Sequence, residues 1–239
     1  MRCYKQLHPL QALSFDLDDT LYPNPEIIAK AELAMQQAIA NALPELSENT
    51  PAYWAQQRRV LAHAKPDIRH DVSQWRLAAL EQGLLSQGVS RCTAQDVSEV
   101  AMLAFLQART AVQLLPTVRP VLAKLARHFK LIAITNGNAD LARMGIADLF
   151  EFSLRAGPDG RMKPAPDLFQ HAAQRLQLPT SAILHIGDHP RSDIVGALNA
   201  GCQTAWITQY LPAPTALSVL PHLQLATLEE LLLLVESAV

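Results

Sequence analysis

The stretch LSFDLDDTLY, residues 13–22, decides the fold of this chain. Its first half is a short apolar run typical of a buried strand, and it ends in three carboxylates and a threonine. Side chains alternate along an extended backbone, so Asp16 and Asp18 are expected on one side and Asp19 on the other, in a structural role. Two adjacent carboxylates repel each other and resist joint ionisation. The stretch therefore indicates either a solvated polar turn or a site where a metal ion or a shared proton uses both charges.

Composition restricts the class of protein. The chain has 239 residues, about half of them apolar, and a formal net charge of −2. This balance argues against nucleic acid or a membrane surface as the main partner. No apolar run reaches the roughly 18 residues of a membrane helix, and no apolar stretch follows Arg2 and Lys5 as in a signal peptide. The three cysteines are widely spaced without a C-x-x-C pair, so we expect a cytoplasmic protein with neither a disulfide framework nor a zinc motif.

Strands alternate with helices in the second half of the chain. The strands are predicted at 131–134, 152–156, 183–186, 204–207 and 223–226. The helices are predicted at 118–128, 167–176, 192–199 and 228–236, and a helix or helical turn at 141–149. Ser192 and Asp193 are predicted to cap the helix that ends before Gly201. This alternation predicts an α/β fold in which a parallel sheet is flanked by helices on both faces.

A helical block follows the first strand. Residues 26–111 contain apolar positions at helical spacing and no convincing strand, with predicted helices at 26–43, 54–64, 72–85 and 93–109. The last of these is predicted to open on a capping box at Thr93–Asp96. We therefore expect two domains, an α/β core formed by residues 1–22 and 113–239, and an inserted all-helical domain formed by residues 23–112.

Three predicted strands of the core end in polar residues. Asp16 and Asp18 follow the first strand, Thr135 and Asn136 follow the second, and Asp188 follows Gly187 later in the chain. Ligand sites of open parallel sheets lie beyond the carboxyl ends of the strands. Several strand ends with reactive side chains at one edge favour a functional site over a solvated turn.

With these residues in hand, the chain resembles the haloacid dehalogenase superfamily over nearly its full length. The resemblance rests on four ordered motifs, Asp16-x-Asp18-x-Thr20, Thr135, Lys163, and Gly187-Asp188 followed by Asp193. It implies a Rossmann-like core with a helical cap inserted between the first two motifs. Within the superfamily, the stretches 12–22, 70–72 with 75–76, 133–138 and 154–160 look most like phosphatases that act on flavin mononucleotide and on the phosphorylated ribitylamino-uracil intermediate of riboflavin synthesis.

The resemblance also implies a role for each motif residue. Asp16 would be the nucleophile that forms an aspartyl-phosphate, and Asp18 the acid and base for the leaving alcohol and the attacking water. Asp16, Asp188 and the main-chain carbonyl of Asp18 would bind Mg²⁺. Lys163 would neutralise charge on Asp16 and on the transferred group. The remaining implied roles are phosphate binding by Thr135 and the amide of Asn136, and support of the metal site by Asp193 and Thr20.

Substrate choice is expected to reside in the cap, because the motif residues recognise only phosphate. Candidate specificity residues are Arg69, His70, Trp75 and Arg76, which combine cations with a ring that could stack on a planar base; the alternative is an amphipathic helix with Trp75 in its core. Asn138 and His189 are expected to border the pocket. The predicted activity is that of a Mg²⁺-dependent phosphomonoesterase acting on a small phosphorylated metabolite. Alternatives are a sugar-phosphate phosphatase, a phosphomutase, or an inactive relative that serves as a binding protein. The oligomeric state is not predicted.

Overall fold

A computed structural model describes residues 1–46, 50–211 and 217–236 of the chain. The chain divides into two compact units, one formed by Met1–Pro23 and Val112–Val239 and the other by Asn24–Ala111. These boundaries lie within one residue of those expected from the sequence. No helix among the described residues is long and apolar enough to cross a membrane.

The first unit is built on a seven-stranded sheet in the order β1-β7-β6-β5-β2-β3-β4. Its strands are β1 (Arg2–Cys3), β2 (Ala12–Phe15), β3 (Lys130–Thr135), β4 (Phe152–Arg155), β5 (Ile183–Gly187), β6 (Gln203–Ile207) and β7 (Leu223–Leu225). All neighbours pair in parallel except β1, which pairs antiparallel with β7. Every residue of β2, β5 and β6 is buried, as expected for central strands covered on both faces.

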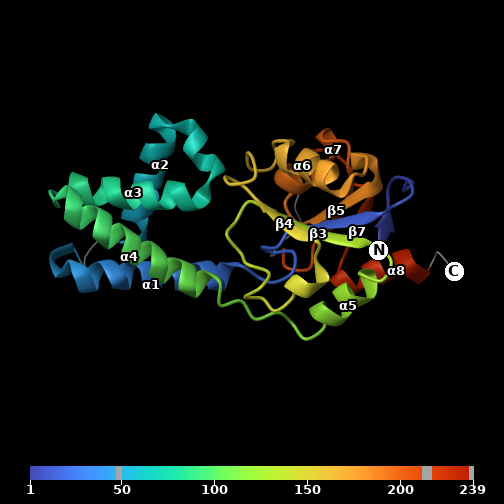
Figure 1. The fold of residues 1–239 in the computed structure, drawn as a ribbon, viewed down its shortest axis with the longest axis horizontal. Coiled ribbons are helices and arrows are strands. Elements are labelled where there is room, and N and C mark those ends of the chain that lie inside the picture. The colour runs from blue at the N-terminus through green and yellow to red at the C-terminus, as the bar shows by residue number, and fades with distance from the viewer. Residues whose placement is uncertain (47–49, 212–216, 237–239) are drawn as a thin grey trace. The chain divides into compact units, whose positions relative to one another are not determined.

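Helices cover both faces of this sheet (Figure 1). On one face lie α6 (Asp167–Leu176) and α7 (Gly196–Asn199), and on the other lie α5 (Val118–Leu125) and α8 (Leu233–Glu236). One buried cluster joins α6 to the sheet, with Leu168, Phe169 and Ala172 packed against Ile132, Ile134 and Ile183. The predicted α/β fold with a mostly parallel, helix-flanked sheet is therefore confirmed, and β1 is an antiparallel edge strand that the sequence analysis did not predict.

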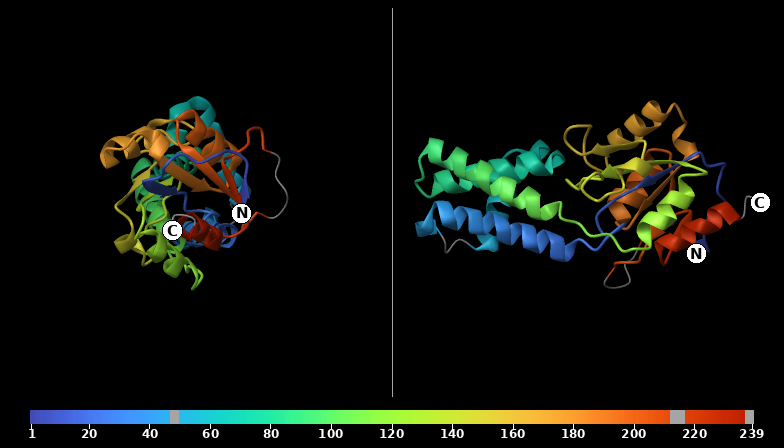
Figure 2. Two further views of the ribbon diagram at one scale, coloured as in Figure 1. Left: turned by 90° about the vertical axis from the view of Figure 1, so that its right-hand side faces the viewer. Right: turned by 60° about the horizontal axis from the view of Figure 1, so that its bottom comes forward.

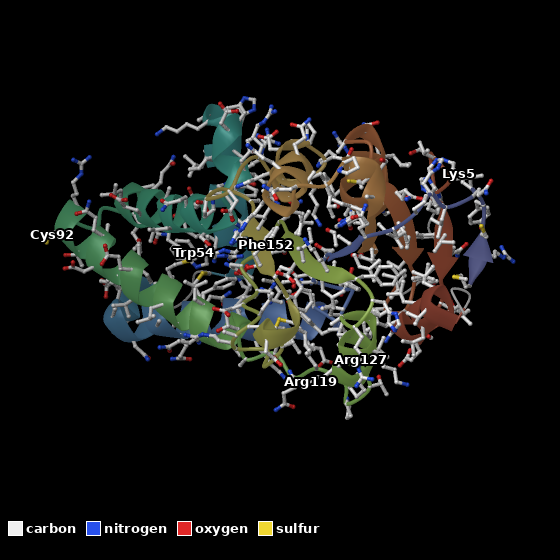
Figure 3. All side chains as sticks on the ribbon, turned by 45° about the vertical axis from the view of Figure 1, so that its right-hand side comes forward. Lys5, Trp54, Cys92, Arg119, Arg127 and Phe152 are labelled. Carbon is white, nitrogen blue, oxygen red and sulfur yellow. The ribbon has the colours of Figure 1, made fainter. Side chains whose placement is uncertain are left out.

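The second unit is entirely helical over the residues that are described. It contains α1 (Pro25–Ala42), α2 (Pro51–Ala64), α3 (Val72–Ser86) and α4 (Arg91–Arg109), with 3₁₀ turns at Pro44–Leu46 and Pro66–His70. Helices α1 and α4 run side by side, as the right-hand view of Figure 2 shows. Trp54, labelled in Figure 3, belongs to the buried cluster of this unit. Its ring packs against Gly83, where a Cβ atom would lie only 2.8 Å from the ring, so α3 requires glycine there.

Several predicted helix ends were wrong. Helix α4 begins at Arg91, and its cap is Ser90, whose hydroxyl accepts a hydrogen bond from the amide of Thr93, so Thr93–Asp96 is not a capping box. The predicted helix at 192–199 begins earlier, as a π-helical turn at Pro190–Val195 that His189 caps and that leads into α7. Ser192 and Asp193 therefore lie inside the turn. Residues 228–232 form a 3₁₀ helix rather than α-helix. Residues 141–149 form turns followed by a short 3₁₀ helix, so of the predicted helix or helical turn the structure has the turn.

Candidate active site

The polar strand ends meet at the centre of the sheet. In the parallel pairing, Phe15 of β2 is level with Ala133 of β3 and with Ile186 of β5, so these three strands end at the same edge. A cavity of about 180 Å³ lies at this edge. Its lining residues are Asp16, Asp18, Asp19, Thr135, Asn136, Gly137, Lys163, Asp188, His189, Ser192 and Asp193. The structure thus brings together the predicted core motif residues except Thr20, which lies just behind two of them.

Lys163 is held between two carboxylates at the base of the cavity. Its side chain is 1% exposed and donates to Asp16 Oδ1 at 2.8 Å, to Asp193 Oδ1 at 2.7 Å and to the carbonyl of Ile134 at 2.7 Å. All three ammonium protons are therefore used. Burial opposes the charge on Lys163, but the Asp16 and Asp193 carboxylates outweigh burial and raise the pKa of the lysine. Lys163 is a cation in a fixed orientation.

The surroundings of Asp16 are more negative than the charge of Lys163 can neutralise. Burial raises the pKa of Asp16 well above its ordinary value, and the neighbouring carboxylates of Asp193 and Asp18 add to the rise while Lys163 opposes it. The pKa of Asp193 is lowered instead, because Lys163 and His185 together overcome the effect of its burial. The charge of Lys163 therefore stabilises Asp193, and Asp16 needs a further cation to remain ionised.

Asp188 is the second carboxylate with a raised pKa. Burial, followed by the charges of Asp193 and Asp19, raises the pKa of Asp188 to about 7. The buried hydroxyl of Thr20 lies 3.4 Å from both Asp16 Oδ2 and Asp188 Oδ1, so it bridges the two carboxylates from behind. The indole of Trp206 donates to the main-chain carbonyl of Asp188 at 2.7 Å. This end of β5 is thus supported from β6.

Asp18 and Asp19 follow the end of β2, where the backbone leaves the extended conformation. The hydroxyl of Tyr22 donates to Asp18 Oδ1 at 2.5 Å and orients this carboxylate. Asp19 has a φ of 55°, a left-handed conformation that aspartate tolerates better than most residues. The expectation that Asp19 turns away was wrong, because strict alternation stops at Phe15 and Asp19 lines the same cavity.

Thr135 and Asn136 extend the site from β3. The Thr135 hydroxyl accepts from the amide of Gly137 at 2.9 Å, which tightens the turn after the strand. The Asn136 side chain forms two hydrogen bonds with the main chain of Lys163, accepting from its amide at 2.7 Å and donating to its carbonyl at 2.9 Å. The Asn136 side chain therefore positions Lys163, which leaves the Asn136 main chain as the part that could bind phosphate.

The donor set fits a hard divalent cation. Carboxylate oxygens of Asp16, Asp188 and Asp193 lie within 4.8 Å of one another. Both Asp193 oxygens are already used, since Oδ1 accepts from Lys163 and Oδ2 accepts from the amide of His189 at 2.9 Å. Asp16 and Asp188 are therefore the carboxylates suited to a metal ion. Oxygen donors and excess negative charge are what Mg²⁺ prefers.

Comparisons with known proteins assign the family. A sequence profile described as "haloacid dehalogenase-like hydrolase" matches residues 10–201. The chain belongs to the haloacid dehalogenase-like hydrolases. It is 38% identical to the 5-amino-6-(5-phospho-D-ribitylamino)uracil phosphatase YigB of Escherichia coli, over 97% of this chain and 98% of that protein. It is 30% identical to the glyceraldehyde 3-phosphate phosphatase of Methanopyrus kandleri, over 83% and 84% of the two chains.

A solved structure shows the same fold. The crystal structure described as a 2-haloacid dehalogenase from Pseudomonas syringae pv. Tomato has a TM-score of 0.89 and 35% identity, covering 96% of this hydrolase and all of that chain. A magnesium-bound hydrolase of Bacillus subtilis, 20% identical with a TM-score of 0.65, shares the fold. The fold and family that the sequence motifs predicted are therefore confirmed.

Sequence reasoning missed two residues behind the site of this haloacid dehalogenase-like hydrolase. His185 of β5 lies between Ser14 of β2, at 2.9 Å from Nδ1, and Asp193, at 3.3 Å from Nε2. Burial, followed by the charge of Lys163, lowers the pKa of His185 to about 4, so its ring is neutral near pH 7. The available signal was a polar residue inside each of two otherwise apolar buried strands.

The candidate specificity residues lie at the start of α3 and just before it. Arg76 forms an ion pair with Glu32 at 2.6 Å, and its guanidinium lies 3.8 Å from the centre of the Phe105 ring. The indole of Trp75 donates to the carbonyl of Arg58 at 2.8 Å, and Arg69 donates to the carbonyl of Pro66 at 3.3 Å. His70 is partly buried. These contacts organise the helical unit, and a role of the four residues in specificity remains a prediction.

Of the two residues expected to border the pocket, one lies at the cavity. His189 lines the cavity, whereas Asn138 is not among the described residues that line it.

Proposed function

We propose that this haloacid dehalogenase-like phosphatase removes phosphate from a small phosphorylated metabolite through a covalent aspartyl-phosphate on Asp16. The observation that carries the proposal is the arrangement of Asp16 in the cavity. Lys163 at 2.8 Å and Thr20 at 3.4 Å approach its two oxygens from below, and Thr135, Asn136 and Asp18 lie around it. A nucleophile, a fixed cation and a second carboxylate within one small cavity match the needs of phosphoryl transfer.

The reaction would proceed in two steps. In the first, a carboxylate oxygen of Asp16 attacks phosphorus, the bond from phosphorus to the ester oxygen breaks, and Asp18 donates a proton to the leaving alcohol. In the second, Asp18 takes a proton from water and the water oxygen attacks phosphorus. The bond between phosphorus and the Asp16 oxygen breaks, which frees inorganic phosphate and restores the Asp16 carboxylate. Tyr22 orients Asp18 for both proton transfers. Lys163 stays charged throughout and offsets the negative charge of the transferred group.

Asp16, Asp188 and the main-chain carbonyl of Asp18 would hold the Mg²⁺ ion. When bound, the ion supplies positive charge that keeps Asp16 ionised and offsets charge on the phosphoryl oxygens. The chain supports this assignment with the raised pKa values of Asp16 and Asp188, which show that both carboxylates lack a sufficient cation in the protein alone.

The substrate proposed first is the phosphorylated ribitylamino-uracil precursor of riboflavin or flavin mononucleotide. Support comes from the Escherichia coli relative, whose similarity extends over both units rather than over the core alone. The helical unit, which we propose acts as a cap, would supply the contacts to the part of the substrate beyond phosphate. We propose that Arg69, His70, Trp75 and Arg76 take part in these contacts.

Other activities of the same fold remain alternatives. A sugar-phosphate or triose-phosphate phosphatase is supported by the Methanopyrus kandleri relative. A phosphomutase would share Asp16 and Asp18 but pass the phosphoryl group to a second hydroxyl instead of water. A dehalogenase needs no acid for a halide leaving group, so Asp18 favours a phosphatase. An inactive binding protein is disfavoured because Asp16, Asp18, Lys163 and Asp188 are all present and gathered in one cavity.

The nucleophile is tested by changing Asp16 to Asn and measuring phosphate release from p-nitrophenyl phosphate. The Asp16→Asn variant should have no turnover, and a chelator should abolish turnover of the unchanged protein. The exposed Asp96→Asn change in the helical unit is the matched control and should keep full activity. Substantial turnover by the Asp16→Asn variant would exclude the covalent mechanism.

The substrate is tested by measuring phosphate release across a panel of phosphorylated metabolites. The panel includes flavin mononucleotide, the phosphorylated ribitylamino-uracil, glyceraldehyde 3-phosphate, phosphoglycolate and hexose phosphates. The riboflavin-related compounds should give the highest kcat/KM. The assignment fails if these compounds are inert while the sugar phosphates turn over rapidly. Formation of a new phosphorylated sugar, in place of free phosphate, would identify a phosphomutase.

A further inference from the structure

A buried row of polar groups runs from the interior of the sheet to Asp16. Ser14 and His185 are direct neighbours in the β2–β5 pairing, and both are 0% exposed. The row continues from His185 to Asp193, from Asp193 to Lys163, and from Lys163 to Asp16. Polar groups so far from solvent are retained only when each has a partner, and here each one does.

The hydrogen bonds assign the donor at each position. The ionised Asp193 carboxylate only accepts, so the His185 nitrogen that faces it, Nε2, must carry the proton. A neutral ring then has a bare Nδ1, which accepts from the Ser14 hydroxyl. Phe169 of α6 packs its ring edge-on against the imidazole, with the ring centres 4.9 Å apart, and holds the plane of the ring. Ser14 and Phe169 therefore select one tautomer and one orientation of His185.

His185 shares its acceptor with the catalytic lysine. Asp193 Oδ1 accepts from both His185 Nε2 and Lys163 Nζ, while Oδ2 accepts from the main chain of His189. Gly187 allows this approach, since a Cβ atom there would lie 2.4 Å from Asp193 Cγ. Removal of the His185 donor would leave Oδ1 with Lys163 as the remaining donor of this pair, so the Asp193 carboxylate would be less firmly oriented and would allow Lys163 to shift away from Asp16.

We propose that His185 is a positioning residue for phosphoryl transfer, which acts through Asp193 to hold the Lys163 ammonium group against Asp16. The expected effect on kcat rests on the proposed function, whereas the assigned tautomer and hydrogen bonds of His185 do not. His185 does not touch the substrate. Its imidazole fixes the donor that stabilises the transferred group, so its loss should affect the transition state more than substrate binding.

Two variants at position 185 test the kinetic part. His185→Leu removes the donor, and His185→Gln places an amide donor close to the position of Nε2. The leucine variant should lose about tenfold to hundredfold in kcat on p-nitrophenyl phosphate with KM changed little, as is typical when the partner of an active-site ligand is removed. The glutamine variant should recover most of the loss. Inhibition by orthovanadate, which mimics the five-coordinate phosphorus, should weaken in parallel with kcat.

The matched control is Ile183→Val, on the same strand as His185 and in the buried cluster that contains Phe169. This change removes a methylene group two residues before His185 and leaves the hydrogen bonds of the buried polar row in place. It should lower the unfolding temperature and leave kcat unchanged. A folded leucine variant with unchanged kcat, or a loss of kcat in Ile183→Val that equals the loss in the leucine variant, would overturn the proposal.

The tautomer is tested without any activity measurement. Two-bond ¹H–¹⁵N correlation spectra of the imidazoles should show His185 as a neutral ring protonated on Nε2, and Ser14→Ala should reduce the preference for this tautomer together with kcat. A ring protonated on Nδ1 in the unchanged protein would contradict the proposal. If His185→Leu does not fold, Ser14→Ala decides the outcome, and an unchanged kcat in that variant would overturn the proposal.

Failure of the proposed function would look different. In that case the unchanged protein would release phosphate from none of the esters, while the spectra would still support or contradict the assigned tautomer. If the unchanged protein is active and neither His185→Leu nor Ser14→Ala changes kcat, only the positioning role is overturned.

Discussion

Replacement of Asp188 by Asn should make the metal-free protein more stable while it destroys the metal response. Asp188 is a partly buried carboxylate close to Asp16, and its pKa is raised to about 7 by burial and then by the charges of Asp193 and Asp19. An amide of nearly the same shape keeps the carbonyl oxygen that faces Thr20 and carries no charge. Selection for a cation site and selection for stability are therefore opposed at this position.

The magnitude and its pH dependence follow from the pKa. A raised pKa means that the folded state favours the neutral Asp188 carboxyl group. The stability of the folded protein that comes from this preference is fully present below pH 3.8 and is lost as the pH rises through about 7. Each pKa unit corresponds to about 1.4 kcal/mol, so ionisation of Asp188 costs the folded protein up to about 4 kcal/mol above pH 8. The Asn variant avoids most of this cost, which amounts to a gain of roughly 5–15 °C in unfolding temperature for a chain of this length.

Scanning calorimetry in the presence of a chelator measures this effect. The chain has two compact units, and the unfolding transition of the α/β unit is the one to follow. The variant should exceed the unchanged protein at pH 8, and the two should coincide near pH 4, where Asp188 is protonated. Added Mg²⁺ should raise the unfolding temperature of the unchanged protein more at pH 8 than at pH 6, and should have little effect on the variant.

The exposed Asp96→Asn change provides the control, since it makes the same chemical replacement in the helical unit. It should leave both the stability difference and the Mg²⁺ response unchanged. The reasoning is refuted if Asp188→Asn lowers the unfolding temperature of the metal-free protein at pH 8, or if its advantage is the same at pH 4 and pH 8.

Three further changes give distinct expected results. Lys163→Met should reduce kcat about 10²–10³-fold, because the fixed cation beside Asp16 is lost, and steady-state kinetics checks this against KM. Asp18→Asn should lower the first-turnover rate with alkyl phosphates about 10²–10⁴-fold. The rate with p-nitrophenyl phosphate should fall much less, since p-nitrophenolate leaves without a proton. Equal losses of rate in rapid-quench measurements would argue against an acid role of Asp18. Gly187→Ala should destabilise the core by about 1–3 kcal/mol and reduce kcat, because its Cβ atom would collide with Asp193; urea unfolding and kinetics measure the two effects.

Local pattern predicted the secondary structure wherever burial follows a simple period. The strands β2, β3, β5 and β6 are mostly apolar because both of their faces are covered. Prediction failed where several residues compete for one task. Ser90 and Thr93 both suit a helix cap, and the choice of Ser90 depends on how the chain enters α4. The antiparallel strand β1 contains two exposed residues and exists only because β7 offers an edge.

The candidate site divides in the same way. Asp16, Asp18, Thr135 and Asp188 could be predicted because each follows a strand, and strands of a parallel sheet end at one edge. Asp19 could not be placed, because its orientation depends on a left-handed residue after the strand has ended. His185 and Ser14 gave only a faint signal, two polar residues in apolar strands, and no pattern within either strand indicates that they face each other.

The opening stretch thus determined by itself that a buried strand delivers carboxylates to a sheet edge, because this depends only on a short apolar run with acidic residues directly after it. Tertiary structure alone decided how those charges are balanced. Lys163 lies 147 positions from Asp16 and reaches it only through the folding of the whole α/β unit. The pairing of β2 with β5 places Ser14 beside His185, and the turn after Gly187 brings Asp193 within reach of both His185 and Lys163. Charges and protons are shared through space, so their assignment depends on contacts that no local sequence pattern contains.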